Sequence, residues 1–293
     1  MDAHTRILNG KTARYFTMSN PKAQQTAHFY GGNGFAVGVY APLLNALHEK
    51  LNISALAMRG EWVDTPTSFK NTREQDAELL IQFLEQTQDK PVIGIGHSQG
   101  ATATTMAAAK RPELFSQLFL LEPVTFTKRQ ALLYNLTPKT LKLTQEPFKS
   151  TLKKPATWPS VEAYYQHLRE HKAYKRISDD HLQTYATNSL APLEQGSSAH
   201  GHDWVLKFPP AQELANYFGM PFIMDALEQV IRADKVPVTL IIGKPSMFIS
   251  DEVRQTWEKF VPAERIITLS KYGHLLPMEA PELCAELILD ALN

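Results

Sequence analysis

Short apolar runs alternate with longer amphipathic segments through residue 123 of the chain. The apolar runs predict strands at residues 14–18, 27–30, 53–58, 91–95 and 118–121. Apolar positions that recur at helical spacing predict helices at residues 42–50, 72–88 and 101–109. Strands that alternate with helices are typical of an α/β protein, in which helices cover both faces of a mostly parallel sheet.

The alternation stops after residue 123 and resumes near residue 233. The interval contains helical segments at 161–170 and 180–185, frequent prolines and aromatic residues, and no predicted strand. Beyond it, strands are predicted at 238–242 and 266–269, and helices at 252–260 and 281–292. A helical insertion between parallel strands is expected to cap the carboxyl edge of the sheet, where such sheets bind ligands. The sequence thus predicts a core of residues 1–123 and 233–293 and a helical cap of residues 124–232.

The charge of the chain is balanced, with 30 basic and 30 acidic residues. The chain contains no long block of like charges that would indicate a nucleic-acid or membrane partner. No apolar segment reaches membrane-spanning length, and none near the first residue has the pattern of a signal peptide. Cys284 is the single cysteine, so an intramolecular disulfide is excluded. We therefore expect a cytoplasmic protein.

The pentapeptide Gly96-His97-Ser98-Gln99-Gly100 connects an apolar predicted strand to an alanine-rich predicted helix. A serine on so sharp a turn has a strained backbone and an exposed hydroxyl, and the two glycines leave room for the turn. The N–H groups at the start of the helix point toward charge that develops beside Ser98. The pattern therefore predicts Ser98 as a nucleophile.

A serine hydroxyl needs a neighbouring base, and the base needs a third group that orients it. His274 follows the last predicted strand and is preceded by Gly273. Because the carboxyl ends of parallel strands meet at one edge of a sheet, His274 is predicted to lie beside Ser98 and to act as the base.

Four segments together resemble the α/β-hydrolase superfamily, and in particular its cap-bearing serine hydrolases. They are Gly31–Phe35, Gly96–Gly100, Leu121–Val124 and Gly273–Glu279. The resemblance covers nearly the whole chain. It implies an eight-stranded, mostly parallel sheet with a helical cap, and a hydrolase that cleaves a carboxylic ester or a related thioester or lactone through an acyl-enzyme.

The sequence departs from the family pattern at two positions. Ser246 stands where many of these proteins carry the acid, so the resemblance moves the acid to Glu122, after the strand that precedes the cap. Asp251 is the alternative acid. Gly31 stands where a histidine is expected, and His28 is either a packed strand residue or a substitute for that histidine.

The resemblance also implies the residues that surround the nucleophile. The backbone N–H groups of Asn33 and Gln99 are expected to form the oxyanion hole. Gly32, Phe35 and His97 are expected to bind the substrate, a small molecule. The aromatic cap favours an apolar or aromatic acyl compound. No organic cofactor or metal is implied, and the oligomeric state is left open.

Three further sequence patterns allow other interpretations. The glycines at 94, 96 and 100 are spaced one residue too widely for a dinucleotide-binding loop. The run His200-Gly201-His202-Asp203 is better explained as a polar loop, and His167 and His171 lack a third metal ligand. The five lysines between residues 139 and 154 fit a solvated cap face or a weak attraction for an anionic substrate.

A last alternative keeps the fold and changes the function. A protein of this fold can bind a ligand without catalysing a reaction. Such proteins usually lose a member of the triad, whereas this chain retains Ser98, His274 and a candidate acid. The enzymatic interpretation is therefore preferred.

Overall fold

The computed structural model describes residues 1–64, 70–193, 202–219 and 224–292. His200 and Gly201 of the weighed metal motif lie outside these residues. A large sheet of eight strands forms the centre of the molecule, in the order β1-β2-β4-β3-β5-β6-β10-β11. The strands are β1 (Asp2–Leu8), β2 (Lys11–Met18), β3 (Thr26–Tyr30), β4 (Asn52–Leu56), β5 (Val92–His97), β6 (Phe115–Leu121), β10 (Val238–Lys244) and β11 (Ile266–Ser270).

Six strands of this sheet run parallel, from β4 to β11, and the hairpin of β1 and β2 adds two antiparallel strands at one edge. Every residue of β5 is buried, as expected for a central parallel strand that helices cover on both faces. The predicted α/β class with a mostly parallel, eight-stranded sheet is confirmed. The strand β1 was not predicted, because most of its residues are exposed and show no buried alternation.

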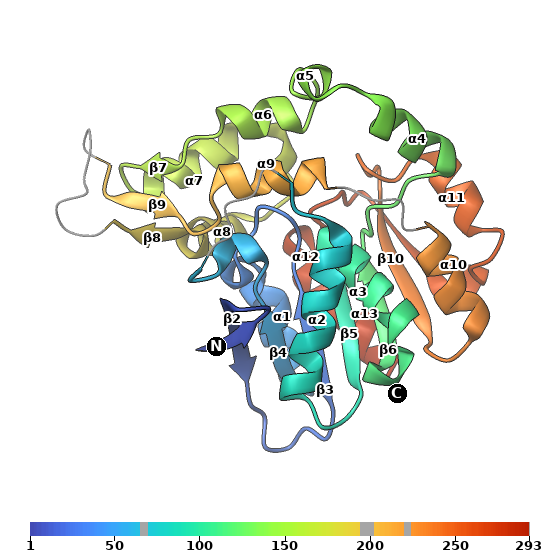
Figure 1. Cartoon of the computed structure of the whole chain (residues 1–293). Helices are drawn as coiled ribbons and strands as arrows, with labels where there is room; N and C mark the ends of the chain where they lie inside the picture. The colour runs from blue at the N-terminus through green and yellow to red at the C-terminus, as the bar shows by residue number, and fades with distance from the viewer. Residues whose placement is uncertain (65–69, 194–201, 220–223, 293) are drawn as a thin grey trace.

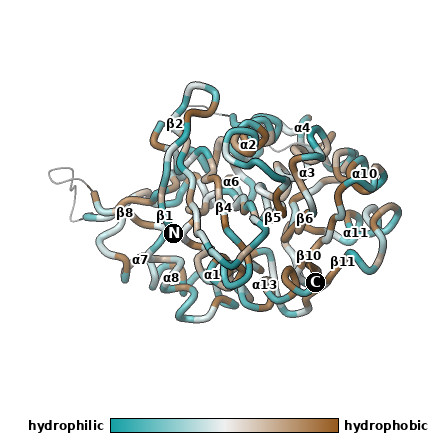
Figure 2. Tube along the Cα trace, turned by 90° about the horizontal axis from the view of Figure 1, so that it is seen from below, coloured by the Kyte–Doolittle hydropathy of each residue, from teal (hydrophilic) through white to brown (hydrophobic). Residues whose placement is uncertain are grey.

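Helices form a layer on each face of the sheet (Figure 2). On one face lie α1 (Ala41–His48) and α13 (Pro281–Asp290), which contact each other. On the other lie α2 (Arg73–Thr87), α3 (Gln99–Lys110) and α10 (Met224–Ala233), in contact through α3. Two further helices belong to the last part of the chain, α11 (Asp251–Trp257) and α12 (Leu276–Glu279). Single 3-10 turns occur at η1 (Val37–Tyr40), η2 (Arg59–Glu61), η3 (Pro112–Leu114), η4 (Lys172–Tyr174) and η5 (Ala263–Arg265).

The segment between β6 and β10 arches over one end of the sheet (Figure 1). Its helices there are α4 (Lys128–Leu136), α5 (Lys139–Lys142), α6 (Phe148–Lys153), α7 (Val161–Glu170), α8 (Asp179–Ser189) and α9 (Pro210–Phe218). The helix α10 also falls in the predicted cap range 124–232, but it packs against α3 of the core.

The prediction that this segment contains no strand is wrong. A small antiparallel sheet joins β7 (Thr157–Trp158), β9 (Trp204–Leu206) and β8 (Leu190–Pro192). Strands of two or three residues are too short to produce a period of two in the sequence, so pattern reasoning misses them. Within the described residues, no helix combines the length and apolar character that crossing a membrane would need.

Candidate active site

Ser98 lies at the turn between β5 and α3 in a strained conformation, with φ 52° and ψ −114°. Its N–H donates to the Leu121 carbonyl at 3.0 Å, which ties the turn to the end of β6. A Cβ on Gly96 would come within 2.4 Å of the Ala101 backbone, and one on Gly100 within 1.9 Å of the Tyr30 carbonyl oxygen. Only glycine fits at either position, so the two glycines permit this turn.

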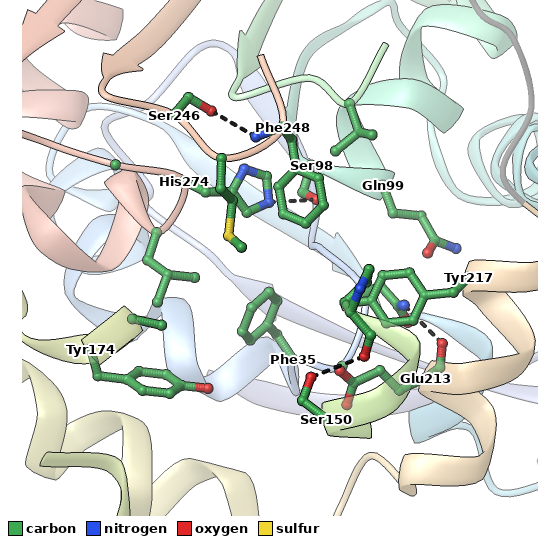
Figure 3. A pocket seen from close by; sticks show the side chains of 18 of the residues that line it. Phe35, Ser98, Gln99, Ser150, Tyr174, Glu213, Tyr217, Ser246, Phe248 and His274 are labelled. Carbon is green, nitrogen blue, oxygen red and sulfur yellow. Dashed lines mark hydrogen bonds between the residues drawn. The ribbon is translucent and has the colours of Figure 1, made fainter. Parts of the chain in front are cut away.

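His274 lies beside Ser98, with its Nε2 atom 3.0 Å from the serine Oγ (Figure 3). The ring of Phe248 packs edge-on against the imidazole, with centroids 4.3 Å apart. The other ring nitrogen, Nδ1, lies 3.1 Å from Oε2 of Glu122. With Nδ1 as donor and Nε2 as acceptor, His274 has the tautomer that can take the Ser98 proton.

Glu122 is fully buried at the end of β6, and its φ of 48° turns the chain away from the strand. Its Oε1 accepts the Gly243 N–H at 2.6 Å, and its Oε2 accepts the Ser246 hydroxyl at 2.5 Å. Ser246, at the position where the family pattern has its acid, thus holds the carboxylate that comes from the neighbouring strand. Asp251, the alternative acid, is exposed at the first position of α11.

His97 is fully buried and does not line the pocket, so its predicted contact with substrate is corrected. Its Nε2 donates to the His274 carbonyl at 2.9 Å, and its Nδ1 accepts the Tyr40 hydroxyl at 2.8 Å. The Tyr40 oxygen in turn accepts the Gly32 N–H at 2.7 Å. Burial lowers the pKa of His97 to about 3, so the ring is neutral. This chain of bonds joins the loop at residues 31–35 (the glycine loop), the turn at Ser98 and the loop at His274.

Gly32 also lies outside the pocket lining and its N–H donates to the Tyr40 hydroxyl, so its predicted contact with substrate is corrected in the same way. Asn33, Phe35 and Gln99 do line the pocket with Ser98 and His274.

His28 packs on β3 within 3.3 Å of the Ser54 hydroxyl, and burial lowers its pKa to about 3. It lies outside the pocket lining and does not replace the histidine missing at Gly31.

The Asn33 side chain fastens the glycine loop to α9 of the insertion. Its Nδ2 donates to the Glu213 carbonyl at 2.9 Å, and its Oδ1 accepts from Asn216 at 2.8 Å. The Glu213 carboxylate, in turn, accepts the Lys154 ammonium at 2.8 Å. Burial opposes the charge on Lys154, but Glu213 outweighs it and raises the pKa of the lysine.

The pocket beside Ser98 has a volume of about 410 Å³ and lies between the sheet edge and the insertion (Figure 3). Its apolar and aromatic lining includes Phe35, Val124, Tyr174, Tyr217, Met247, Phe248 and Leu275. The lining also contains the charged residues Arg73, Lys154, Arg176, Glu213 and Glu279, and the histidines His171 and His274. Sequence reasoning did not single out Arg73, Arg176 or Glu213, because they come from separate segments without a common motif.

Residues 28–287 match the model of the alpha/beta hydrolase family. The chain belongs to this family. The resemblance carried by the four motif segments is thereby confirmed. Among curated relatives, an uncharacterized hydrolase of Bacillus subtilis, YugF, is 25% identical over 98% of this chain and 96% of its own length. A type I acyl-CoA thioesterase of Penicillium roqueforti, mpaH, is 28% identical over 45% of this chain and 28% of its own length.

Solved structures support the same fold. E-2-(acetamidomethylene)succinate hydrolase superposes with a TM-score of 0.79 at 16% identity, over 99% of both chains. The thioesterase domain from the curacin biosynthetic pathway gives a TM-score of 0.73 at 17% identity, also over 99% of both chains. At these identities the similarity shows the fold alone.

Proposed function

We propose that this protein is a serine hydrolase that cleaves a carboxylic ester or a related acyl bond, such as a thioester or lactone. The observation that carries the proposal is the continuous set of contacts from Ser98 Oγ to His274 Nε2 at 3.0 Å and from His274 Nδ1 to Glu122 Oε2 at 3.1 Å. These distances lie within hydrogen-bond reach of a nucleophile, its base and the acid that orients the base.

The reaction follows from the roles of these groups. Ser98 Oγ attacks the acyl carbon while His274 Nε2 takes the serine proton, and Glu122 stabilises the imidazolium. The N–H groups of Gln99 and Asn33 donate to the carbonyl oxygen as it becomes negative. His274 then protonates the leaving group, and the acyl group stays on Ser98 until a water, deprotonated by His274, releases it.

The pocket lining bears on the substrate class. The rings of Phe35, Tyr217 and Phe248 offer apolar walls near the nucleophile, which supports an aromatic or other apolar acyl compound. Relatives in the family include a protein named for acyl-CoA thioester cleavage, so thioesters belong among the first compounds to test.

Steady-state hydrolysis of p-nitrophenyl esters and of acyl-CoA thioesters, with chains from two to twelve carbons, tests the proposal. We expect turnover by the wild type and a loss of roughly 10⁴-fold or more in Ser98→Ala, with circular dichroism unchanged. Equal turnover by the two proteins would reject Ser98 as nucleophile. Saturable ligand binding without turnover by either protein would favour the alternative, a ligand-binding protein of this fold.

A further inference from the structure

Arg73 occupies an unusual position for a positive charge. It is the first residue of α2, its side chain is 4% exposed, and it lines the pocket that contains Ser98. Burial disfavours an unpaired cation, and the partial positive charge of a helix N-terminus adds to the cost. A cation at this position is therefore stabilised by a neighbouring anion.

The protein itself supplies only half of the required negative charge. Asp76 lies between two guanidinium groups, and its Oδ1 accepts Arg59 Nε at 2.9 Å. Its Oδ2 accepts the Gln99 side chain at 2.7 Å, while Arg73 Nη1 lies 3.7 Å away, beyond hydrogen-bond distance. Two cations therefore share one carboxylate. Burial lowers the pKa of Arg73 to about 10, against the opposing effect of Asp76, so the group stays charged at neutral pH.

Nη1 of Arg73 is a buried donor without a hydrogen-bond partner in the described part of the chain. The two carboxylates that line the pocket are engaged elsewhere. Glu213 is bonded to Lys154, and Glu279 accepts the Gly273 N–H at 2.6 Å. Among the described residues, no carboxylate besides Asp76 is within ion-pair distance of Arg73.

Arg73 is linked to the Ser98 turn through Asp76. Gln99, whose N–H is expected to bind the oxyanion, follows Ser98 directly and shares the Asp76 carboxylate with Arg73. A substrate held at Ser98 thus lies in the same pocket as the Arg73 guanidinium, and aromatic side chains line that pocket as well.

We propose that Arg73 is a specificity residue that binds a carboxylate of the substrate, so that the compound cleaved at Ser98 is an acyl ester or thioester carrying a second, anionic group. This inference rests on the proposed function. A guanidinium can hold a carboxylate through two parallel N–H donors, and bonds of this kind are about twice as strong as neutral ones. The bound carboxylate supplies the charge that the buried Arg59–Asp76–Arg73 cluster lacks.

Two matched substrate pairs test the proposal. One compares p-nitrophenyl hemisuccinate with its neutral methyl ester, which places the charge on the acyl side. The other compares 3-acetoxybenzoate with methyl 3-acetoxybenzoate, which places it on the leaving group. The readout is the ratio of kcat/KM for the anionic member over the neutral one, corrected for spontaneous hydrolysis, in wild type, Arg73→Gln and Arg73→Lys.

We expect the wild type to favour the anionic member of at least one pair. Arg73→Gln should lower that ratio by about 10- to 100-fold, the range of a hydrogen bond to a charged group. Arg73→Lys should restore part of it, because the charge returns without the planar fork. Arg232→Gln, which removes an exposed cation on α10, is the control for net charge and should keep the ratio.

Three results would overturn the proposal. They are a wild-type enzyme that hydrolyses both pairs without preference for the anion, an unchanged ratio in Arg73→Gln, and an equal fall in Arg176→Gln, which removes the other arginine of the pocket lining. Failure of the proposed function gives a different result, namely no hydrolysis of any of the four esters.

Calorimetric titration with monomethyl succinate and benzoate covers the case of an inactive protein or an unfolded Arg73→Gln. Binding by the wild type that weakens at least tenfold in folded Arg73→Lys or Arg73→Gln supports the site. Equal affinity in wild type and variant, or no binding by the wild type, rejects it.

Discussion

Replacing Glu122 by glutamine tests the assignment of the acid at the level of single hydrogen bonds. The carboxylate accepts three donors: the Gly243 N–H on Oε1, and the Ser246 hydroxyl and His274 Nδ1 on Oε2. A glutamine amide has one acceptor and one donor group. If its NH₂ takes the place of Oε1, it opposes the Gly243 N–H. If it takes the place of Oε2, it forces His274 Nδ1 to accept, which leaves a proton on Nε2 where the Ser98 proton must go.

The expected cost follows from that wrong tautomer and from the lost charge beside the imidazolium. The corresponding change in a serine protease triad lowers kcat by about 10⁴. We expect a loss of about 10³- to 10⁴-fold for Glu122→Gln, equal to about 4–5.5 kcal/mol of activation free energy.

The assay is single-turnover and steady-state hydrolysis of a p-nitrophenyl ester, together with circular dichroism and a thermal melt. Asp251→Asn is the matched control, because it removes the same charge from the alternative acid at an exposed helix start. It should change kcat by less than about threefold, the scale of a surface charge near a helix end. A folded Glu122→Gln within tenfold of the wild type, or a larger loss in Asp251→Asn, would show that Glu122 is not the acid.

Ser246→Ala removes one of the three hydrogen-bond donors to Glu122. In a stopped assay of ester hydrolysis, it should lower kcat by about tenfold with little effect on KM. An unchanged kcat would mean that the Ser246 hydroxyl does not position the carboxylate. Tyr40→Phe leaves the acceptor His97 Nδ1 without its donor and should lower the free energy of unfolding, measured in urea, by about 1–3 kcal/mol. An unchanged urea midpoint of unfolding would show that the Tyr40–His97 hydrogen bond does not stabilise the fold. The pKa values of His28 and His97, lowered from 6.5 to about 3, should make stability fall below pH 6.5 by about 1.4 kcal/mol per pH unit for each histidine. Burial raises the pKa of Glu61 from 4.5 to about 7, so Glu61 stabilises the fold at low pH. This contribution is lost as pH rises from about 4.5 to about 7, and over that range it offsets the effect of one histidine. Glu61→Gln should therefore steepen the acid loss between pH 6.5 and 4.5, and urea titrations that show the same slope as the wild type would contradict this.

Much of the fold could be predicted because the central strands are long and buried. The residues of β5 do not alternate between apolar and polar, as expected for a strand buried on both faces, and the alanine-rich α3 follows after one sharp turn. The hydrophobic pattern and the glycine spacing therefore predict the same strand, turn and helix. The edge strand β1 and the short strands of the insertion could not be predicted, because exposure and length remove the pattern on which such reasoning depends.

The site was predictable as far as single motifs reach. Ser98, His274 and Glu122 each follow a strand, and their functional roles stay predictions. Ser246 was recognised as a departure, but its bond to Glu122 depends on the register between β6 and β10, which the sequence does not state. Arg73 belongs to no sequence motif. It became a candidate only because it is buried beside the charge of Asp76, and both features depend on tertiary contacts.

Covalent labelling measures directly whether the hydroxyl of Ser98 is activated. The protein is incubated with a fluorophosphonate, digested, and mapped by tandem mass spectrometry, with Ser98→Ala and His274→Ala treated in parallel. We expect one adduct on Ser98 in the wild type and none in Ser98→Ala. Labelling of His274→Ala should be at least 100-fold slower, because the base no longer takes the proton. A folded wild type that stays unlabelled, or an adduct on a different residue, would contradict this expectation.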